Sequence, residues 1–192
     1  MESQQKEKMT VNLKTFEPSK LLWLDLEMTG LDPKEDLVLE LAIEVTDMNL
    51  ETLDSYENRI KHPKPAVVDR MNKNIWWRDY PENRNDFLEG LSEAKPIQAV
   101  EKELLRIIEH HFGKDDPVVL AGNSIYNDRL FIKQWFPELE LRLHYRMLDV
   151  TSFKILMQSR YSVYFEKPEV HRAYEDVQAS IAELQHYFKY MK

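Results

Sequence analysis

The stretch Leu21-Leu22-Trp23-Leu24-Asp25-Leu26-Glu27-Met28-Thr29-Gly30 decides the fold. Its first residues are bulky and apolar, which predicts a strand buried at the centre of a sheet. Asp25 and Glu27 interrupt this strand near its end. Because side chains two apart in a strand project from the same face, both carboxylates point the same way. The segment 29–33 has the composition of a turn that follows the strand.

Two neighbouring carboxylates at the end of a buried strand are unfavourable without a counter-charge. Like charges at short range raise the pKa of one group or require a cation. A divalent metal ion bound by Asp25 and Glu27 resolves this conflict. The alternative is that the strand has already ended and that both side chains are solvated, since an isolated D-x-E pattern is common.

Outward from this strand, the pattern predicts further strands and then alternating strands and helices. Short apolar or branched runs predict strands at 38–46, 52–60, 117–121 and 145–148, with a hairpin at 47–49. Helical periodicity predicts helices at 97–111, from a cap at Asn123 or Ser124 to about 135, and at 151–160. One apolar stripe defines the last helix: Ala173, Val177, Ile181, Leu184 and Phe188. The fold class expected is α/β, a mixed central β-sheet flanked by α-helices.

Length and composition fit one globular domain. The chain has 192 residues and a net charge of −8, and we expect a polar leader at 1–19 and a single domain at 20–192. It has no cysteine, which excludes disulfides and thiolate zinc sites. The acidic balance argues against gripping long nucleic acids, although it allows a short one. No apolar run is long enough to span a membrane, and a cytoplasmic location is expected by default.

Three further residues can carry chemistry. Asp128 lies about one turn into the helix after the strand at 117–121, where aspartates usually interact with the helix dipole. His171 and Asp176 open the last helix. Their spacing of five places them about 140° apart if both are helical, so they share a side only if His171 lies in the preceding loop. Each residue taken alone is as compatible with an ordinary surface or structural role.

Together these residues form the order D-x-E … D … H-x-x-x-x-D, which is the pattern of the DEDDh exonucleases. The context extends the match through Leu24-Asp25-Leu26-Glu27-Met28-Thr29-Gly30-Leu31-Asp32 and Ala121-Gly122-Asn123-Ser124. It continues in His144-Tyr145-Arg146, Leu148-Asp149-Val150 and His171-Arg172-Ala173. The chain resembles the oligoribonuclease family of DEDDh 3′→5′ exonucleases over residues 20–62 and 117–190.

The resemblance implies a ribonuclease-H-like fold, a homodimer and a short RNA substrate, with dinucleotides preferred and nucleoside 5′-monophosphates as products. It implies that Asp25, Glu27 and Asp176 bind a first divalent ion and that Asp25 and Asp128 help to hold a second. His171 would be the general base. Carboxylate oxygens favour Mg²⁺ or Mn²⁺, and two such ions can clamp the attacking and leaving oxygens of an in-line displacement.

The resemblance also implies substrate contacts at both ends of a dinucleotide. Met28 and Leu31 in the opening motif would bind the substrate, and Leu31 would wedge between the two bases; the alternative for Leu31 is an ordinary core leucine in a turn. Ser124 and Arg146 would bind the 5′ phosphate, and Thr151 keeps the hydroxyl of the family's usual serine.

In the family the tyrosine of the His-Tyr-Arg motif reaches the partner's site. Tyr145 is that residue here, and the alternative is a partly buried strand tyrosine.

The segment 71–93 departs from the family. Asn74 stands where a base-contacting tryptophan is usual, Trp76 and Trp77 lie close enough to substitute for it, and Asp79 stands where a histidine is usual. Two other functions are compatible with the sequence. One is a broader DEDDh exonuclease that trims single-stranded RNA or DNA, and the other is an interaction module that has lost catalysis.

Overall fold

Strand β1 (Lys20–Met28) lies in the middle of the sheet. In the computed structural model, which describes residues 16–167 and 171–191, the described residues form a five-stranded sheet in the order β3-β2-β1-β4-β5. β2 (Val38–Asp47) pairs with β1 antiparallel, and β4 (Val118–Gly122) pairs with it parallel. β3 (Thr52–Arg59) and β5 (Leu143–Asp149) form the edges. The expected mixed sheet is confirmed; most of the polar leader expected at 1–19 lies outside the described residues.

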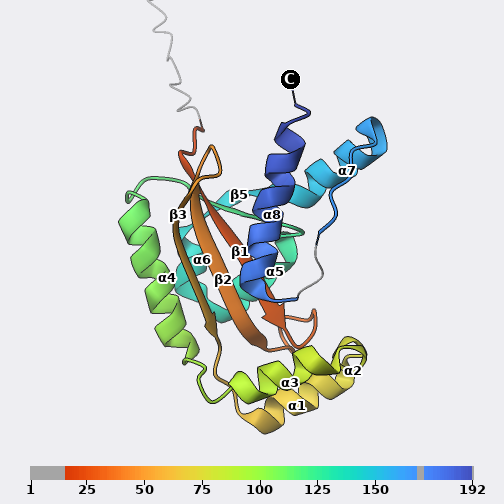
Figure 1. The fold of residues 1–192 in the computed structure, drawn as a ribbon. Helices are drawn as coiled ribbons and strands as arrows, with labels where there is room; N and C mark the ends of the chain where they lie inside the picture. Colours follow the sequence, from red (N-terminus) through yellow and green to blue (C-terminus); the bar gives the residue numbers. More distant parts are fainter. Residues whose placement is uncertain (1–15, 168–170, 192) are drawn as a thin grey trace, which may run out of the picture.

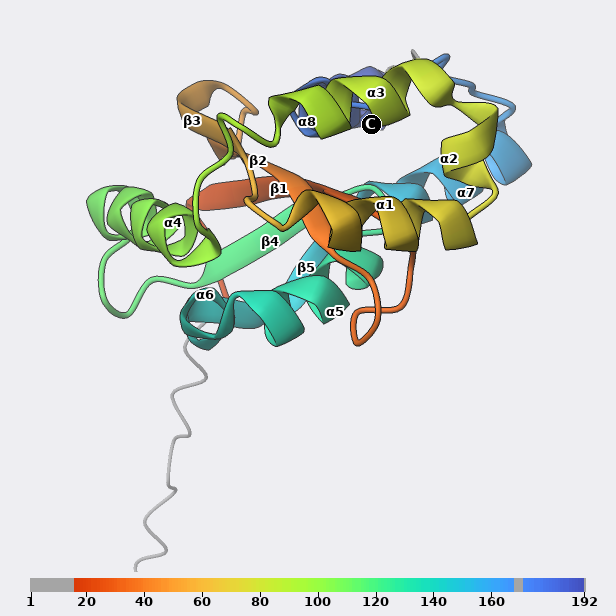
Figure 2. The same cartoon turned by 90° about the horizontal axis from the view of Figure 1, so that it is seen from below.

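Helices cover both faces of the sheet (Figures 1 and 2). One face carries α4 (Ile97–His111), α5 (Tyr126–Trp135) and α6 (Pro137–Arg142), and the other carries α7 (Val150–Tyr161) and α8 (Ala173–Phe188). Three short helices lie beyond the end of β1 and the start of β2: α1 (Lys64–Lys73), α2 (Trp76–Asp79) and α3 (Pro81–Gly90). Among the described residues no helix is long and apolar enough to cross a membrane.

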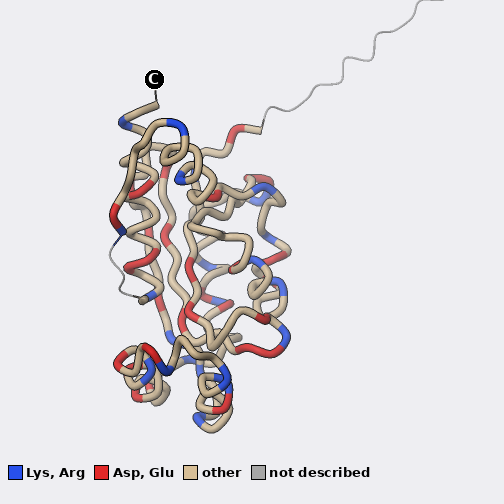
Figure 3. Tube along the Cα trace, turned by 90° about the vertical axis from the view of Figure 1, so that its right-hand side faces the viewer, with Lys and Arg blue, Asp and Glu red and all other residues tan. Residues whose placement is uncertain are grey.

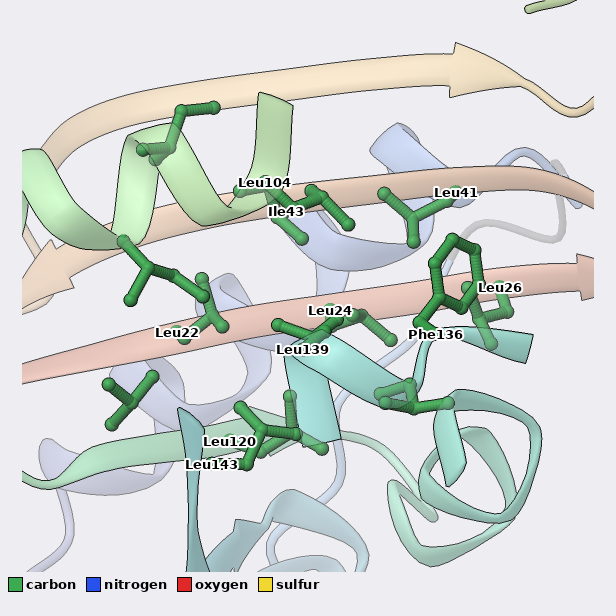
Figure 4. Close-up of a cluster of buried hydrophobic side chains, with 14 of the residues drawn as sticks. Leu22, Leu24, Leu26, Leu41, Ile43, Leu104, Leu120, Phe136, Leu139 and Leu143 are labelled. Atoms are coloured by element: carbon green, nitrogen blue, oxygen red, sulfur yellow. The ribbon is translucent and has the colours of Figure 1, made fainter. Parts of the chain in front are cut away.

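The alternation of β1 determines which face carries the carboxylates. Leu22, Leu24 and Leu26 point into the larger core beneath α4, α5 and α6 (Figure 4). Leu21 and Trp23 point the other way, into the core beneath α7 and α8. Since side chains alternate along a strand, Asp25 and Glu27 belong to the face that α8 covers.

Helix α8 follows the predicted stripe with one correction. Ala173, Val177, Ile181 and Leu184 are buried, whereas Phe188 is exposed. Tyr187 is buried in its place, because the helical period returns to the covered face three residues after Leu184.

The predicted cap of α5 is wrong. The helix begins at Tyr126 with Ile125 as its N-cap residue and without a side-chain cap. Ser124 has a positive φ of 48° and lies in the tight turn before the helix, and the side chains of Asn123 and Ser124 bond to distant segments instead of the first helical turn.

Candidate active site

Three carboxylates meet where β1 ends. One oxygen each of Asp25, Glu27 and Asp176 lie within 4.8 Å of one another. Asp25 and Glu27 share a face of β1, and Asp176 lies in the first turn of α8, which packs on that face. The prediction that Asp25 and Glu27 point the same way is confirmed, because Asp176 meets both of them.

The electrostatics of this cluster favour a cation. Burial, together with the charges of Asp176 and Glu40, raises the pKa of Glu27 to about 8. Burial and then the charge of Asp128 raise the pKa of Asp25 well above its ordinary value. Carboxylates that resist ionisation in this way are stabilised as anions when a positive ion sits among them.

Asp128 lies beside the cluster and is held by the main chain of β1. The parallel ladder between β1 and β4 ends at Trp23 and Ala121, so Leu26 N–H has no partner from β4 and donates to Asp128 Oδ1 at 3.0 Å. Gly122 allows β4 to turn away this close to β1, because a Cβ there would lie 2.8 Å from the carbonyl oxygen of Leu24. Asp128 is 6% exposed, and burial raises its pKa to about 7.

A lysine already lies at the cluster. Lys167 Nζ lies 2.7 Å from Asp176 Oδ1, and its charge favours the ionised forms of Asp25 and Asp128. The sequence analysis missed this residue. Its position four residues before His171 was the available signal, but a lysine in a loop has no spacing pattern that distinguishes it from a solvated one.

His171 lies in the loop before α8, as its sharing a side with Asp176 required. Its φ of 56° is left-handed, and its Nε2 is buried without a hydrogen-bond partner among the described residues. The ring makes edge contacts with Trp76 and Tyr80, at centroid distances of 5.0 and 5.2 Å. Trp76 also stacks on Tyr80 at 4.5 Å, so the aromatic pair from α2 and its end fixes the imidazole from one side.

Arg172 anchors the other side of the same loop. Its Nε and Nη2 donate to the two oxygens of Glu40 at 3.0 and 2.8 Å, and Ala173 N–H donates to Glu40 at 3.2 Å. Glu40 is 2% exposed and pairs directly with Glu27 across β1 and β2. This buried glutamate therefore fixes the residue after His171 and the first N–H of α8, a role that the sequence analysis did not identify.

A cleft of about 320 Å³ opens beside Glu27 and His171. Leu31 lies at this cleft and is 75% exposed, so the alternative of a core leucine is wrong. Met28, Trp76 and Trp77 also line it, but Trp77 is 1% exposed and donates from Nε1 to Thr29 O at 2.9 Å. Of the two tryptophans considered as substitutes, Trp76 is therefore the one whose side chain is partly exposed at the cleft.

The residues expected to bind a 5′ phosphate come together only in part. Ser124 Oγ and Thr151 Oγ1 are 3.1 Å apart. The Arg146 guanidinium lies over the rings of Phe16 and Tyr145, at 4.5 and 4.9 Å. Tyr145 is 70% exposed, so the alternative of a partly buried strand tyrosine is wrong.

This geometry fits hard divalent cations. The donors are carboxylate oxygens alone, which suit Mg²⁺ or Mn²⁺ and not softer metals. His171, whose Nε2 has no hydrogen-bond partner among the described residues, lines the same cleft as Glu27. Figure 3 shows that acidic and basic residues are interspersed along the trace.

Comparisons with known proteins agree with this chemistry. Residues 22–184 match the exonuclease family RNase T. The chain is 39% identical to an oligoribonuclease of Corynebacterium glutamicum over 88% of its own length and 78% of the relative's. It is 37% identical to a probable oligoribonuclease of Caenorhabditis elegans, with coverages of 88% and 86%. A mitochondrial oligoribonuclease of Saccharomyces cerevisiae is 34% identical, with coverages of 95% and 72%.

Solved structures support the fold independently. Exonuclease I of E. coli in complex with an oligonucleotide superposes with a TM-score of 0.61 at 13% identity, over 91% of the chain. Exonuclease I of Methylocaldum szegediense gives 0.59 at 16% identity, over 90% of the chain. The chain spans about two fifths of the length of either protein, 41% in both cases. This likeness establishes a shared ribonuclease-H-like architecture.

Proposed function

The chain belongs to the oligoribonuclease family and is a 3′→5′ exoribonuclease that acts on short RNA, and from this premise we propose how its residues carry out the reaction. The observation that carries the proposal is the cluster of Asp25, Glu27 and Asp176, whose oxygens lie within 4.8 Å of one another beside His171. We assign phosphodiester hydrolysis to this cluster.

Asp25, Glu27 and Asp176 would hold one divalent ion, and Asp25 with Asp128 would hold a second. When bound, a pair of Mg²⁺ or Mn²⁺ ions supplies Lewis-acid activation of a water molecule and charge stabilisation at the scissile phosphate. His171 Nε2 accepts the proton of the attacking water, since it is buried and has no competing partner among the described residues. Two contacts orient the loop that carries His171 for this proton transfer. Trp76 packs against the imidazole, and Glu40 holds the neighbouring Arg172.

The substrate lies with its bases between Leu31 and Trp76 and with its 5′ phosphate at Ser124 and Thr151. This arrangement favours dinucleotides, because a longer chain would have to extend through the position of the terminal phosphate. Arg146 completes the phosphate site when its guanidinium turns from Phe16 towards Ser124; a guanidinium recognises a terminal phosphate with paired hydrogen bonds.

The present position of Arg146 supports a second candidate function. With Arg146 over Phe16 and Tyr145, the phosphate site holds only the two hydroxyls, and a longer single strand could pass it. The enzyme would then trim the 3′ ends of longer single-stranded RNA or DNA with the same chemistry.

A homodimer belongs to the same proposal. Tyr145 projects into solvent with 70% of its surface exposed, which leaves it available to reach the active site of a second copy. A cytoplasmic location also remains a proposal, and the yeast relative is named as mitochondrial.

The test is a time course with 5′-labelled RNA of two, three, five and ten nucleotides, first in Mg²⁺ and then in Mn²⁺, resolved by length. We expect fast loss of the dinucleotide and slow trimming of the ten-mer. Equal or faster trimming of the ten-mer would contradict the length preference and support the second candidate. Size-exclusion chromatography with light scattering tests the dimer on the same preparation.

A further inference from the structure

A hydrogen-bond chain runs from buried residues of α8 to the proposed phosphate site. The Asn123 amide group donates to Glu183 Oε2 and to Ser180 Oγ, both at 3.0 Å. Its carbonyl oxygen accepts from Thr151 Oγ1 at 3.3 Å. Glu183 is 0% exposed and Ser180 is 2% exposed, so these groups depend on one another for hydrogen bonds.

The donors and acceptors along this series of hydrogen bonds have a fixed order. Both N–H groups of Asn123 are used by Glu183 and Ser180, so its carbonyl oxygen must face Thr151. Thr151 donates its single hydroxyl hydrogen to that oxygen, and its Oγ1 accepts a hydrogen bond from Ser124 N–H at 2.9 Å. The Ser124 hydroxyl must therefore be the donor in its 3.1 Å hydrogen bond to Thr151 Oγ1, and of the two hydroxyls it is the one that can turn its hydrogen towards a ligand when it gives up that bond.

The same series of hydrogen bonds reaches Asp176 in helix α8. Ser180 Oγ donates to the carbonyl oxygen of Asp176 at 2.8 Å, while it accepts from Asn123. Glu183 is held independently, since Tyr187 OH donates to its Oε1 at 2.7 Å and Lys154 lies 3.8 Å from the same oxygen. The carboxylate cluster and the Ser124 hydroxyl are thus connected through one hydrogen-bond network.

We propose that Asn123 and Glu183 are positioning residues for recognition of the substrate's 5′ phosphate. Glu183 fixes the Asn123 amide, Asn123 fixes the Thr151 hydroxyl, and Thr151 leaves Ser124 as the hydroxyl that donates to the phosphate. The link through Ser180 holds this donor at a constant distance from the carboxylates, and a constant distance selects a short substrate. This inference rests on the proposed function, which assigns the 5′ phosphate to Ser124 and Thr151.

The test compares one RNA dinucleotide with and without a 5′ phosphate. For each protein, KM and kcat are measured for both substrates, and the discrimination is the ratio of the two values of kcat/KM. We expect Asn123→Ala to raise KM for the phosphorylated dinucleotide about 10- to 100-fold, the effect of losing a hydrogen bond to a charged group. KM and kcat for the 5′-hydroxyl dinucleotide stay within about twofold, because only phosphate contacts are lost.

Two further variants distinguish loss of the Thr151 hydroxyl from a folding defect. Thr151→Val removes the hydroxyl without changing the shape of the side chain and should lower the discrimination as Asn123→Ala does. Thr151→Ser restores the hydroxyl and should restore the discrimination. The matched control is Ile108→Val, which removes a buried methyl group from the core on the opposite face of the sheet, so that the melting temperature falls while the discrimination stays at the wild-type value.

The outcomes separate the inference from the proposed function. A wild-type enzyme that does not discriminate between the two dinucleotides would overturn the phosphate site itself. A wild-type enzyme that discriminates, combined with an Asn123→Ala variant that discriminates equally well, would overturn the positioning role alone. Loss of discrimination in Ile108→Val as well would also overturn it, because any loosening of the core would then suffice.

Discussion

Replacing Glu40 by glutamine tests how His171 is held in place. The substitution keeps the shape of the side chain and removes its charge, so the paired hydrogen bonds from Arg172 at 2.8 and 3.0 Å lose their charge assistance. Hydrogen bonds to charged groups contribute about 1.5–3 kcal/mol each, and breaking a fully buried ion pair costs about 3–5 kcal/mol. Since the Arg172 side chain is still 32% exposed, we expect Glu40→Gln to lower the free energy of unfolding by about 2 kcal/mol.

The effect on catalysis follows from the position of Arg172 in the chain. His171 is the preceding residue and has a left-handed φ of 56°, a conformation that persists because its neighbours are held on both sides. We call the Arg172–Glu40 ion pair the tether. If the tether stabilises this conformation of His171 by about 1.4–2 kcal/mol, its loss lowers kcat about 10- to 30-fold. KM for the dinucleotide should change little, because Glu40 lies outside the cleft.

Urea denaturation and steady-state kinetics on the same preparation measure both effects. Asp86→Asn is the matched control, because Asp86 contacts the outer edge of Arg172 at 3.4 Å and its side chain is 50% exposed; such a pair contributes at most about 1 kcal/mol. A Glu40→Gln enzyme that loses stability but keeps kcat within twofold would refute the tether. It would mean that Trp76 and Tyr80 alone orient the imidazole.

Three other perturbations address the carboxylate cluster. Asp25→Asn should abolish turnover at least 10³-fold, as expected for loss of metal-ion catalysis, and should leave the circular dichroism spectrum unchanged; near-normal activity would exclude the cluster. The folded-state pKa values of Glu27 and Asp128, about 8 and about 7, lie above their ordinary values, so the native metal-free protein binds more protons than the unfolded chain between about pH 4 and 8. Its free energy of unfolding in EDTA should therefore fall as the pH rises through this window, by an amount on the order of a few kcal/mol, and Mg²⁺ should reduce the fall; stability that rises with pH would contradict the buried acids. Lys167→Gln removes the cation 2.7 Å from Asp176 and should tighten Mg²⁺ binding in calorimetry about fivefold, since roughly 1 kcal/mol of competition is lost; weaker binding would show that the lysine supports the ion.

Local pattern was sufficient for the centre of the fold. The alternation of β1 placed Asp25 and Glu27 on one face, and the apolar stripe placed Ala173, Val177, Ile181 and Leu184 on the buried side of α8. Both inferences depend on the backbone period alone, which is a property of consecutive residues.

The supporting contacts of the site could not be predicted because they join distant parts of the chain. Asp128 is fixed by Leu26, 102 residues away, and Arg172 by Glu40, 132 residues away. In the sequence, Glu40 and Glu44 within the strand at 38–47 resemble the polar half of a half-exposed strand, yet both are buried. Only the packing of α8 makes Glu40 an internal residue.

The segment of short helices illustrates the same limit. In α1, α2 and α3 few residues are apolar, and they do not form a continuous stripe. Val67, Met71, Trp77 and Phe87 are nevertheless buried together on Leu39 of β2. Tertiary packing of this kind, and not helical periodicity, stabilises short helices.

The order in which the carboxylates occur along the chain has a consequence for synthesis. Asp176 leaves the ribosome about 150 residues after Asp25, and at typical elongation rates that interval lasts roughly 8–30 seconds. Until α8 docks on β1 and β2, the strand carries two acidic side chains without the third one and without His171. The proposed site is thus incomplete until α8, the last described helix, has docked on the sheet.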